Sequence, residues 1–344
     1  MSRADASPPV PPAAPSAHVP RPPADAGAHG IDAIGVRRSF GAVKAVESVT
    51  FTAHAGRVTA LVGPNGAGKT TLLLMLAGLL TPDAGTLAVA GHDPVAQNVG
   101  VRARTGWMPD TFGTWDSLTA REVLVTVGAA YFLSPAQARR RADELLGVVH
   151  LEDLADAPAR VLSRGQKQRL GLARALVHDP EVLLLDEPAS GLDPRSRVDL
   201  RVLLRRLASE GRTILVSSHV LTELDELADD AVFISRGRTV RESSLAAATG
   251  ERRTWRLRAL DPVVLTAWLD DAGIAYRRVA AGPDGEPGLS AAPDDGSVHV
   301  DLDDDESAAG LVRAAVLAGV PVVSVAPATG ALEQVYLSLE EERR

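Results

Sequence analysis

The sequence predicts an α/β protein: a mostly parallel sheet with an antiparallel β edge and an inserted helical subdomain, followed by a small α+β unit. Three observations support this fold class. Strand and helix patterns alternate over residues 31–245, which favours a parallel sheet with crossover helices. From about 110 to 178 the pattern is helical throughout. The stretch 251–344 then has its own order of elements, β-α-β-β-α-β.

The chain divides into three parts by composition. Residues 1–30 form a Pro/Ala-rich tail, which we expect to be disordered because proline can neither continue a helix nor complete a strand ladder. Residues 31–245 and 251–344 are each long enough to bury a core of their own. Cysteine is absent, which excludes disulfides and thiol chemistry.

The charge is unevenly distributed. Residues 251–344 carry 17 Asp and Glu against 9 Lys and Arg, which accounts for the whole formal charge of -8. Neither part has the basic excess that binding to a phosphate backbone requires, so we expect no nucleic-acid partner. No apolar run approaches the ~20 residues of a membrane span. We therefore expect a cytoplasmic protein that reaches the inner face of the membrane only through a partner.

The first globular part alternates short apolar runs with helical patterns. A capping box, Thr119-Ala120-Arg121-Glu122, opens one helix of the inserted block, and Ser134-Pro135 opens another. The expected strands are Val43–Phe51, Arg57–Val62, Thr86–Ala90, Val182–Leu185, Thr213–Ser217 and Ala231–Ser235. The other expected helices are Lys69–Gly78, Gln166–Val177, 194–209 and 221–227.

A glycine-rich loop, Gly63-Pro64-Asn65-Gly66-Ala67-Gly68-Lys69-Thr70, joins an expected strand to an expected helix with the spacing of a phosphate loop. Its glycines let backbone N–H groups surround phosphate oxygens, and the helix N-terminus adds its positive dipole end. We expect Lys69 to reach the β- and γ-phosphates and the Thr70 hydroxyl to bind Mg²⁺. Thr71 is placed in the same nucleotide site. The competing interpretation is a glycine turn that happens to contain lysine.

Two acidic residues, Asp186 and Glu187, end the aliphatic strand Val182–Leu185. Ligands of α/β proteins bind at the carboxyl ends of such strands. We expect Asp186 to act on Mg²⁺ directly or through a water molecule. Glu187 points the other way and is the candidate that polarises an attacking water. The alternative for an isolated Asp-Glu pair is a solvated strand end.

Two further motifs make the interpretation specific. Leu162-Ser163-Arg164-Gly165-Gln166 precedes a helix, and Ser217-Ser218-His219 closes a strand. With the phosphate loop and Leu185-Asp186-Glu187-Pro188, they resemble the motifs of the ATP-binding subunits of ABC transporters, which are P-loop NTPases. The resemblance covers about residues 31–240. The family signature is usually Leu-Ser-Gly-Gly-Gln, so Arg164 replaces its first glycine here, a variant similar to exporter-type members.

The resemblance implies roles at single positions. It places Ser163, Gly165 and Gln166 at the γ-phosphate held by the opposite subunit, and Arg164 as additional positive charge nearby. It makes His219 a switch that faces the γ-phosphate. Asp193, in the loop Gly191-Leu192-Asp193-Pro194, is implied to carry contact across the dimer.

Two other positions match the family pattern less closely. Phe40 falls where the family stacks an aromatic ring on adenine, and a core phenylalanine is the competing interpretation. Asp110, in Trp107-Met108-Pro109-Asp110, stands where the family normally has glutamine. Because aspartate is shorter, its contact to Mg²⁺ is either direct or through a water molecule.

The resemblance implies an ATPase that dimerises head to tail around two Mg-ATP and drives a separate membrane permease. Because one chain has one phosphate loop and one signature, the expected partner is a second copy, with a related ATPase chain as the alternative. The second domain resembles the extension of drug- and antibiotic-exporter ATPases, so export is favoured over import. The alternative functions are a non-transport ABC-type ATPase acting on ribosomes or DNA, and an inactive regulatory subunit.

The second globular part is expected to be ferredoxin-like, with a last helix on which Leu332, Val335, Tyr336 and Leu339 share one face. An acidic run, Asp301 to Glu306, lies before its second helix. The run lacks the glycine and the distal glutamate of a calcium loop. We therefore interpret it as a solvated strand end followed by acidic helix-start residues.

Overall fold

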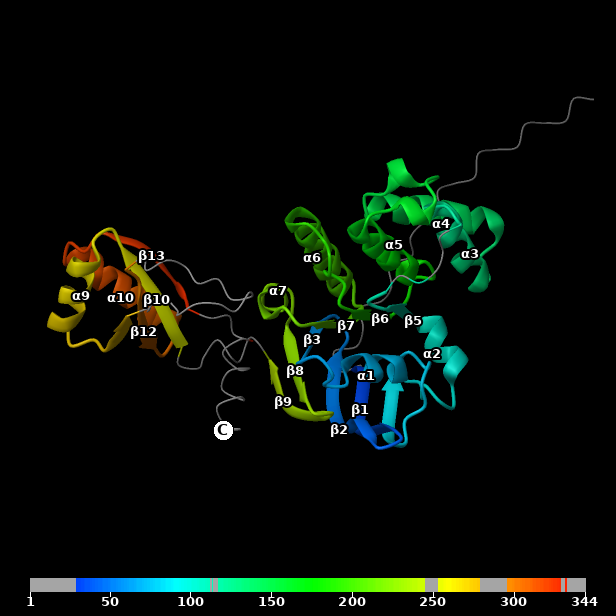
Figure 1. The fold of residues 1–344 in the computed structure, drawn as a ribbon, viewed down its shortest axis with the longest axis horizontal. Coiled ribbons are helices and arrows are strands. Elements are labelled where there is room, and N and C mark those ends of the chain that lie inside the picture. The colour runs from blue at the N-terminus through cyan, green and yellow to red at the C-terminus, as the bar shows by residue number, and fades with distance from the viewer. Residues whose placement is uncertain are drawn as a thin grey trace, which may run out of the picture.

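The computed structural model describes residues 29–111, 113, 117–244, 253–278, 296–328 and 332. Over these residues the strands form one nine-stranded sheet and one separate four-stranded sheet (Figure 1). Residues 1–28 of the predicted tail lie outside the described residues. Within the described ranges, no helix has the length and apolarity needed to cross a bilayer.

The centre of the large sheet is parallel, as predicted. β3 (Val58–Val62) pairs with β7 (Thr213–Ser218) and β8 (Asp230–Ser235), β7 pairs with β6 (Val182–Asp186), and β6 pairs with β5 (Thr105–Met108). Every residue of β3, β6 and β7 is buried. The carboxyl ends of β3, β5, β6 and β7 therefore meet along one edge of the sheet.

One side of the sheet is antiparallel. β1 (His29–Phe40) pairs with β2 (Val43–His54) and β4 (Ala84–Val89), and β8 pairs with β9 (Arg238–Ser244). The full order is β4-β1-β2-β9-β8-β3-β7-β6-β5. The sequence analysis did not predict β1, β5 or β9. The register shifts within β1 break its apolar alternation, and β9 is largely polar.

Alternate residues of each central strand sort into two cores. Leu183 and Leu185 of β6 belong to one apolar cluster, whereas Val182 and Leu184 belong to the other. The first cluster includes residues of α6 (Pro194–Ser209), and the second includes residues of α1 (Lys69–Leu76). Burial on both faces explains why these strands read as continuous aliphatic runs.

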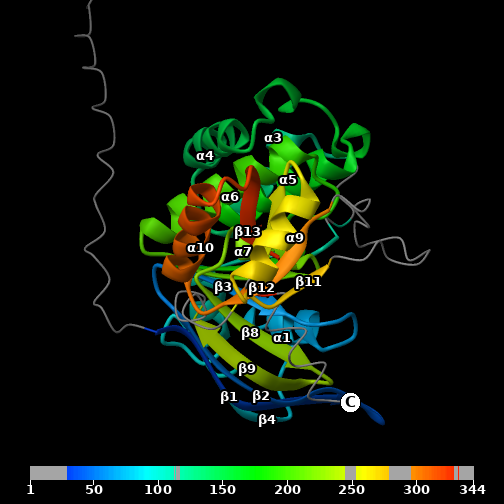
Figure 2. The ribbon, with the colours of Figure 1, turned by 90° about the vertical axis from the view of Figure 1, so that its left-hand side faces the viewer.

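The inserted block is helical, as predicted. It contains α3 (Ala120–Ala130), α4 (Pro135–Val148) and α5 (Arg164–Leu176). The predicted capping box is confirmed, since Glu122 N–H donates to Thr119 Oγ1 at 3.1 Å and Thr119 N–H donates to Glu122 Oε2 at 2.8 Å. These helices lie at the opposite end of the molecule from β1, β2 and β4 (Figure 2).

Two short helices complete the large unit. α2 (Asn98–Arg104) precedes β5 and was not predicted, because its seven residues show too little periodicity to stand out. α7 (Leu221–Asp225) follows β7. It was predicted to extend to 227 but ends two residues earlier.

The four-stranded sheet has the predicted order of elements and is antiparallel throughout, in the order β11-β12-β10-β13. Asp304 caps the second helix by accepting a 2.7 Å hydrogen bond from Ser307 N–H, so the helix-start interpretation of the acidic run is confirmed. Of the predicted last helix, only Leu332 lies among the described residues. The elements are β10 (Arg253–Ala259), α9 (Pro262–Asp271), β11 (Tyr276–Arg278), β12 (Val298–Leu302), α10 (Asp305–Leu317) and β13 (Val322–Pro327).

Close backbone packing joins the sheet to the helical block at Gly106 in β5. A Cβ atom there would lie 2.3 Å from the carbonyl oxygen of Ala175. We expect Gly106→Ala to lower the free energy of unfolding by about 1–3 kcal/mol, because the added methyl group forces β5 and α5 apart.

Gly147, near the end of α4, provides the control. A Cβ atom there meets no atom within 4 Å, so Gly147→Ala is expected to raise the free energy of unfolding by up to about 1 kcal/mol. Urea unfolding followed by circular dichroism measures both. An unchanged midpoint for Gly106→Ala would show that the two elements separate without cost.

Candidate active site

The loop between β3 and α1 depends on its glycines. A Cβ atom at Gly63 would lie 2.2 Å from the carbonyl oxygen of Ile234, and one at Gly68 would lie 2.3 Å from that of Ala45. Gly66 and Gly68 have φ angles of 79° and 102°, in the left-handed region that favours glycine. The loop conformation is therefore fixed by its close packing against Ile234 and Ala45 and by the positive φ angles of Gly66 and Gly68.

The first turn of α1 is arranged to receive an anion. Its N-cap is Gly68, which has no side chain to accept from the first amides, whereas α3, α4 and α5 are capped by side chains. The unpaired N–H groups and the positive end of the helix dipole attract phosphate. The phosphate-loop residues Pro64, Asn65, Gly66 and Thr70 are exposed, and Thr71 is partly exposed.

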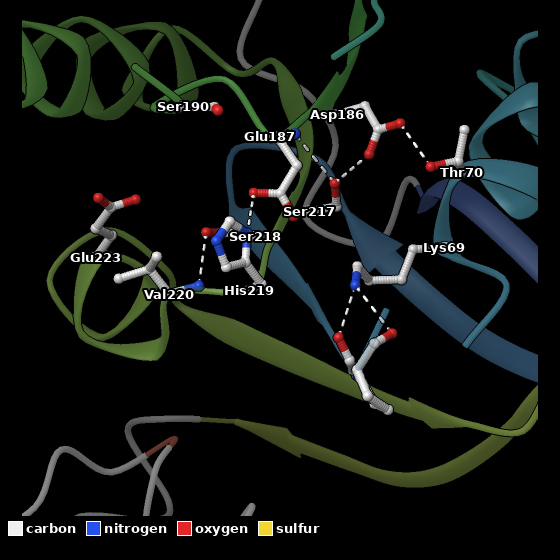
Figure 3. Close-up of polar contacts among 12 residues, drawn as sticks. Lys69, Thr70, Asp186, Glu187, Ser190, Ser217, Ser218, His219, Val220 and Glu223 are labelled. Carbon is white, nitrogen blue, oxygen red and sulfur yellow. Dashed lines mark hydrogen bonds and ion pairs between the residues drawn. The ribbon is translucent and has the colours of Figure 1, made fainter. Parts of the chain in front are cut away.

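Lys69 is a buried cation held by the loop itself. Its Nζ donates to the carbonyl oxygens of Gly63 at 2.6 Å and Pro64 at 3.3 Å (Figure 3). Burial lowers the pKa of the Lys69 ammonium, while the carboxylates of Glu187 and Asp186 oppose that shift. Its partners are neutral, so its charge remains available to a bound anion.

Asp186 sits at the carboxyl end of β6 and is only 3% exposed. Thr70 Oγ1 donates to its Oδ2 at 2.8 Å, and Ser217 Oγ donates to its Oδ1 at 2.6 Å (Figure 3). The phosphate loop, β6 and β7 are thus tied together through one carboxylate. A hydroxyl and a carboxylate in contact are oxygen ligands of the kind Mg²⁺ takes alongside phosphates and water.

Glu187 points away from Asp186, as predicted (Figure 3), and its backbone has a φ of 51°. Such a conformation costs a non-glycine residue roughly 1–3 kcal/mol and is retained where the surroundings enforce it. Here Glu187 N–H donates to the carbonyl oxygen of Ser217 at 3.1 Å, and Gln168 Nε2 donates to the Glu187 carbonyl at 2.9 Å. Strain of this kind clusters at functional sites.

The carboxylate of Glu187 faces His219. Its Oε2 lies 2.8 Å from His219 Nδ1 (Figure 3). The side chain of Glu187 is 17% exposed and that of His219 is 56% exposed. The pair therefore lies at the surface of the sheet edge, open to a ligand bound on the phosphate loop.

The signature residues contact a different part of the chain. Ser163 caps α5 by accepting from Gln166 N–H at 3.3 Å. Arg164 Nη2 donates to Ser190 Oγ at 2.6 Å, so the guanidinium is engaged within its own chain. A Cβ atom at Gly165 would lie 3.1 Å from the Gly191 carbonyl oxygen. The signature is therefore packed on the loop that precedes α6.

Asp193 in that loop caps α6. It accepts from Ser196 N–H at 3.0 Å and from Ser196 Oγ at 2.6 Å. Its carboxylate is thus engaged in starting the helix. The loop conformation follows from this cap together with the Arg164 contact.

Phe40 and Asp110 lie at the periphery. Phe40 is 50% exposed, with the Arg38 guanidinium 4.9 Å from its ring centroid, so the core interpretation is wrong. Asp110 is exposed just beyond β5, on the edge that carries Asp186. Among the described residues, no hydrogen bond joins it to Thr70 or Asp186.

Sequence reasoning missed two residues of this arrangement. Ser217 bonds Asp186 and the Glu187 amide, and Gln168 holds the Glu187 carbonyl. The signal for Ser217 was present, since a hydroxyl residue ends an otherwise aliphatic strand next to β6. Gln168 lies in α5, two residues after the signature and 19 before Glu187, and its residue type alone does not indicate this contact.

The chain is similar to ATP-binding proteins of transport systems. A family model described as ABC transporter matches residues 46–190. The daunorubicin resistance ATP-binding protein DrrA3 of Streptomyces coeruleorubidus is 36% identical over 314 residues, 90% of this chain and 95% of that protein. The Nod factor export ATP-binding protein I of Burkholderia lata is 42% identical over 214 residues, 62% of this chain and 70% of that protein.

Solved structures agree with these relatives. One described as an ATP binding subunit of an ABC transporter has a TM-score of 0.59 and 29% identity, covering 63% of this chain and 91% of its own. A dimeric ATP-binding cassette in a post-hydrolysis state, bound to ADP and Pi, has a TM-score of 0.58 and 25% identity, covering 62% and 98%. The predicted P-loop NTPase fold is confirmed.

Ser217 provides a test of how the site is held together. We expect Ser217→Ala to lower the free energy of unfolding by about 1–3 kcal/mol, because it leaves one oxygen of the buried Asp186 carboxylate without its donor.

Ser209, at the exposed end of α6, donates to the Arg206 carbonyl oxygen at 2.7 Å and serves as the control. Ser209→Ala should stay within about 0.5 kcal/mol of the parent. Urea unfolding without nucleotide measures both. Equal midpoints for the two variants would contradict the role given to Ser217.

Proposed function

This chain belongs to the ABC transporter family, and we propose that two copies of it close around two Mg-ATP to power a separate membrane permease that exports small molecules. One observation carries the proposal. A buried lysine, the Thr70–Asp186 contact and the Glu187–His219 contact converge on the anion-ready end of α1. This set combines a phosphate-binding loop with a second carboxylate, that of Glu187, which points away from Asp186.

ATP binding follows from the loop. The first amides of α1 and the Lys69 ammonium face the phosphates, with the exposed Phe40 ring available to the adenine. Thr70 and Asp186 supply the oxygen ligands that would hold Mg²⁺, whose role is to neutralise charge on the phosphates. Ser217 keeps the Asp186 carboxylate oriented through its 2.6 Å hydrogen bond. The exposed Asp110 is a third candidate ligand, reached through a water molecule.

Hydrolysis requires a group that orients water at the γ-phosphate. Glu187 fits this role, because its backbone conformation turns the carboxylate away from Asp186 and toward His219. Its partly buried carboxylate accepts a proton from the attacking water. His219 holds one oxygen of Glu187, which leaves the other free for the water.

The second copy supplies the signature. In this chain Ser163 and Gly165 make their contacts with Gln166 and with the loop around Gly191. Ser163 and Arg164 at the N-terminus of α5 are exposed, so the positive dipole end of this capped helix is open to an anion held by another copy. A head-to-tail pair brings this end of one copy to the phosphates bound by the other, with the Asp193 loops adjacent. A solved relative at 25% identity is described as dimeric.

A groove of about 1200 Å³ offers a docking place for the permease. It lies between α2, the α3–α4 turn and α6, and it is lined by charged and aromatic side chains. Phe132 is 96% exposed there. Its φ of 62° is that of the left-handed residue that ends α3, since Phe132 N–H donates to the Ala129 carbonyl oxygen and Leu133 N–H to that of Gly128, both at 3.0 Å. His178 stacks on Tyr131 with ring centroids 3.7 Å apart, and burial lowers the pKa of His178 to about 4. An aromatic, partly apolar groove of this kind suits a short helix of a partner.

The named relatives support export. One is named for daunorubicin resistance and another for Nod factor export, and both names refer to organic molecules. The DrrA3 match spans nearly the whole of both chains, including the C-terminal unit. The ribosome or DNA alternative finds no support in these names or in the charge of the chain.

Replacing the proposed base tests the mechanism. We expect Glu187→Gln to bind Mg-ATP as tightly as the parent but to hydrolyse it at least about 100-fold more slowly, since a neutral amide takes no proton. Phosphate release measures turnover, and size-exclusion chromatography with Mg-ATP should show a stable dimer.

Lys69→Ala serves as the contrasting variant, because removing the ammonium should abolish ATP binding as well as turnover. Turnover of Glu187→Gln at the parent rate would assign the base to another residue. A Glu187→Gln chain that stays monomeric with ATP and permease present would refute the two-copy arrangement.

The groove is tested by Phe132→Asn, which keeps a residue tolerant of positive φ and removes the ring. Recovery of a membrane protein encoded by a neighbouring reading frame, after co-expression and affinity purification, is expected to fall at least about tenfold. Leu317→Asn, at an 82% exposed site in α10, is the control and should recover the parent amount. Equal recovery with both variants would place the permease elsewhere.

A further inference from the structure

Three ion pairs join α6 to the segment that follows β7. Arg197 pairs with Glu223 at 3.1 Å, Arg201 pairs with Glu226, and Arg205 pairs with Asp229 at 2.5 Å. The three arginines are spaced four residues apart, so they lie on one face of α6. They hold α7 and the chain after it against that face.

The first of these pairs lies next to the reacting groups. Arg197 is in the first turn of α6, just after the Asp193 cap, and Glu223 is four residues beyond His219. Figure 3 shows Glu223 near His219 and Val220. The other two pairs lie one and two turns further along α6, away from the sheet edge.

The surroundings of Glu223 place it in the electrostatic field of the site. Its side chain is 20% exposed. Burial raises the pKa of the Glu223 carboxyl, Arg197 lowers it, Glu187 raises it and His219 lowers it. Glu223 therefore pairs with α6, and its charge interacts with those of Glu187 and His219.

Packing alone does not fix α7. The helix has five residues, too few to be stable by itself, and Val220 at its N-cap provides no side-chain cap. A cavity of about 250 Å³ lies between α6 and α7, lined in part by Val198, Leu200, Thr222 and Leu224. Leu224 and Leu227 pack into the large core, and the ion pairs add polar contacts that hold α7 to α6 across this open space.

We propose that Arg197 and Glu223 are positioning residues that join the Asp193 loop to α7, the helix that directly follows His219, so that the position of this loop sets the contact between His219 and Glu187. The inference rests on the proposed function, in which the Asp193 loops of two copies meet. Assembly of the dimer then acts on the catalytic carboxylate within each chain, through α6 and α7. Neither residue touches the nucleotide.

The test is a double-mutant cycle on steady-state ATP hydrolysis by the full chain. We expect Arg197→Gln and Glu223→Gln each to lower kcat about tenfold while KM for Mg-ATP changes less than twofold. Because the two residues act as a unit, the double variant should be no slower than either single variant. Arg197→Lys should recover most of the lost kcat, since it restores the charge.

Arg205→Gln is the matched control. It breaks the equivalent pair two turns along the same helix, so a merely structural role of the ladder would give it the same effect as Arg197→Gln. We expect its kcat to stay within twofold of the parent. Thermal midpoints measured in parallel identify any variant that is poorly folded, and Glu223→Asp then provides a second route to the same comparison.

Two outcomes would overturn the inference: equal kcat losses for Arg197→Gln and Arg205→Gln, or single losses that multiply in the double variant. Either result leaves the proposed function standing, provided that the parent hydrolyses ATP and Glu187→Gln does not. A parent chain without ATPase activity would instead refute the proposed function.

Discussion

The register between β6 and β7 is the constraint on which the site depends. Asp186 lies opposite Ser217, and on the other side of β7 Val62 lies opposite Ser218. These pairings bring the phosphate loop, the acidic pair and His219 to one edge. A shift of one residue in either pairing would turn the side chains to the other face, which separates Thr70 from Asp186 and Glu187 from His219.

Within this frame, two opposite charges are buried close together with neutral partners. Lys69 is 7% exposed and is held by carbonyl oxygens, whereas Asp186 is 3% exposed and is held by hydroxyl groups. Burying an ion without partners is costly, and these hydrogen bonds offset part of that cost. Because these partners are neutral, they do not cancel the charge that each side chain presents to a ligand. A phosphate and a cation then complement Lys69 and Asp186 respectively.

The sequence predicted those parts of the fold whose signals are local. The loop Gly63–Thr70 needs glycines where the backbone approaches Ile234 and Ala45, and the aliphatic runs of β3, β6 and β7 reflect burial on both faces. Features set by distant partners were not predictable. β9 becomes a strand only because β8 and β2 are beside it, and Arg164 finds Ser190 across a loop.

The same distinction explains why His219 could be placed at the sheet edge but not oriented from sequence. It follows β7, whose burial pattern is local information, but its direction depends on α7, which is too short to hold a position alone. That position comes from Arg197 on α6 and from Leu332, which is fully buried and whose N–H donates to Asp225 at 2.8 Å. These partners lie 26 and 107 residues from the ones they hold. The orientation of the catalytic pair is therefore a property of the assembled chain, including a residue of its C-terminal segment.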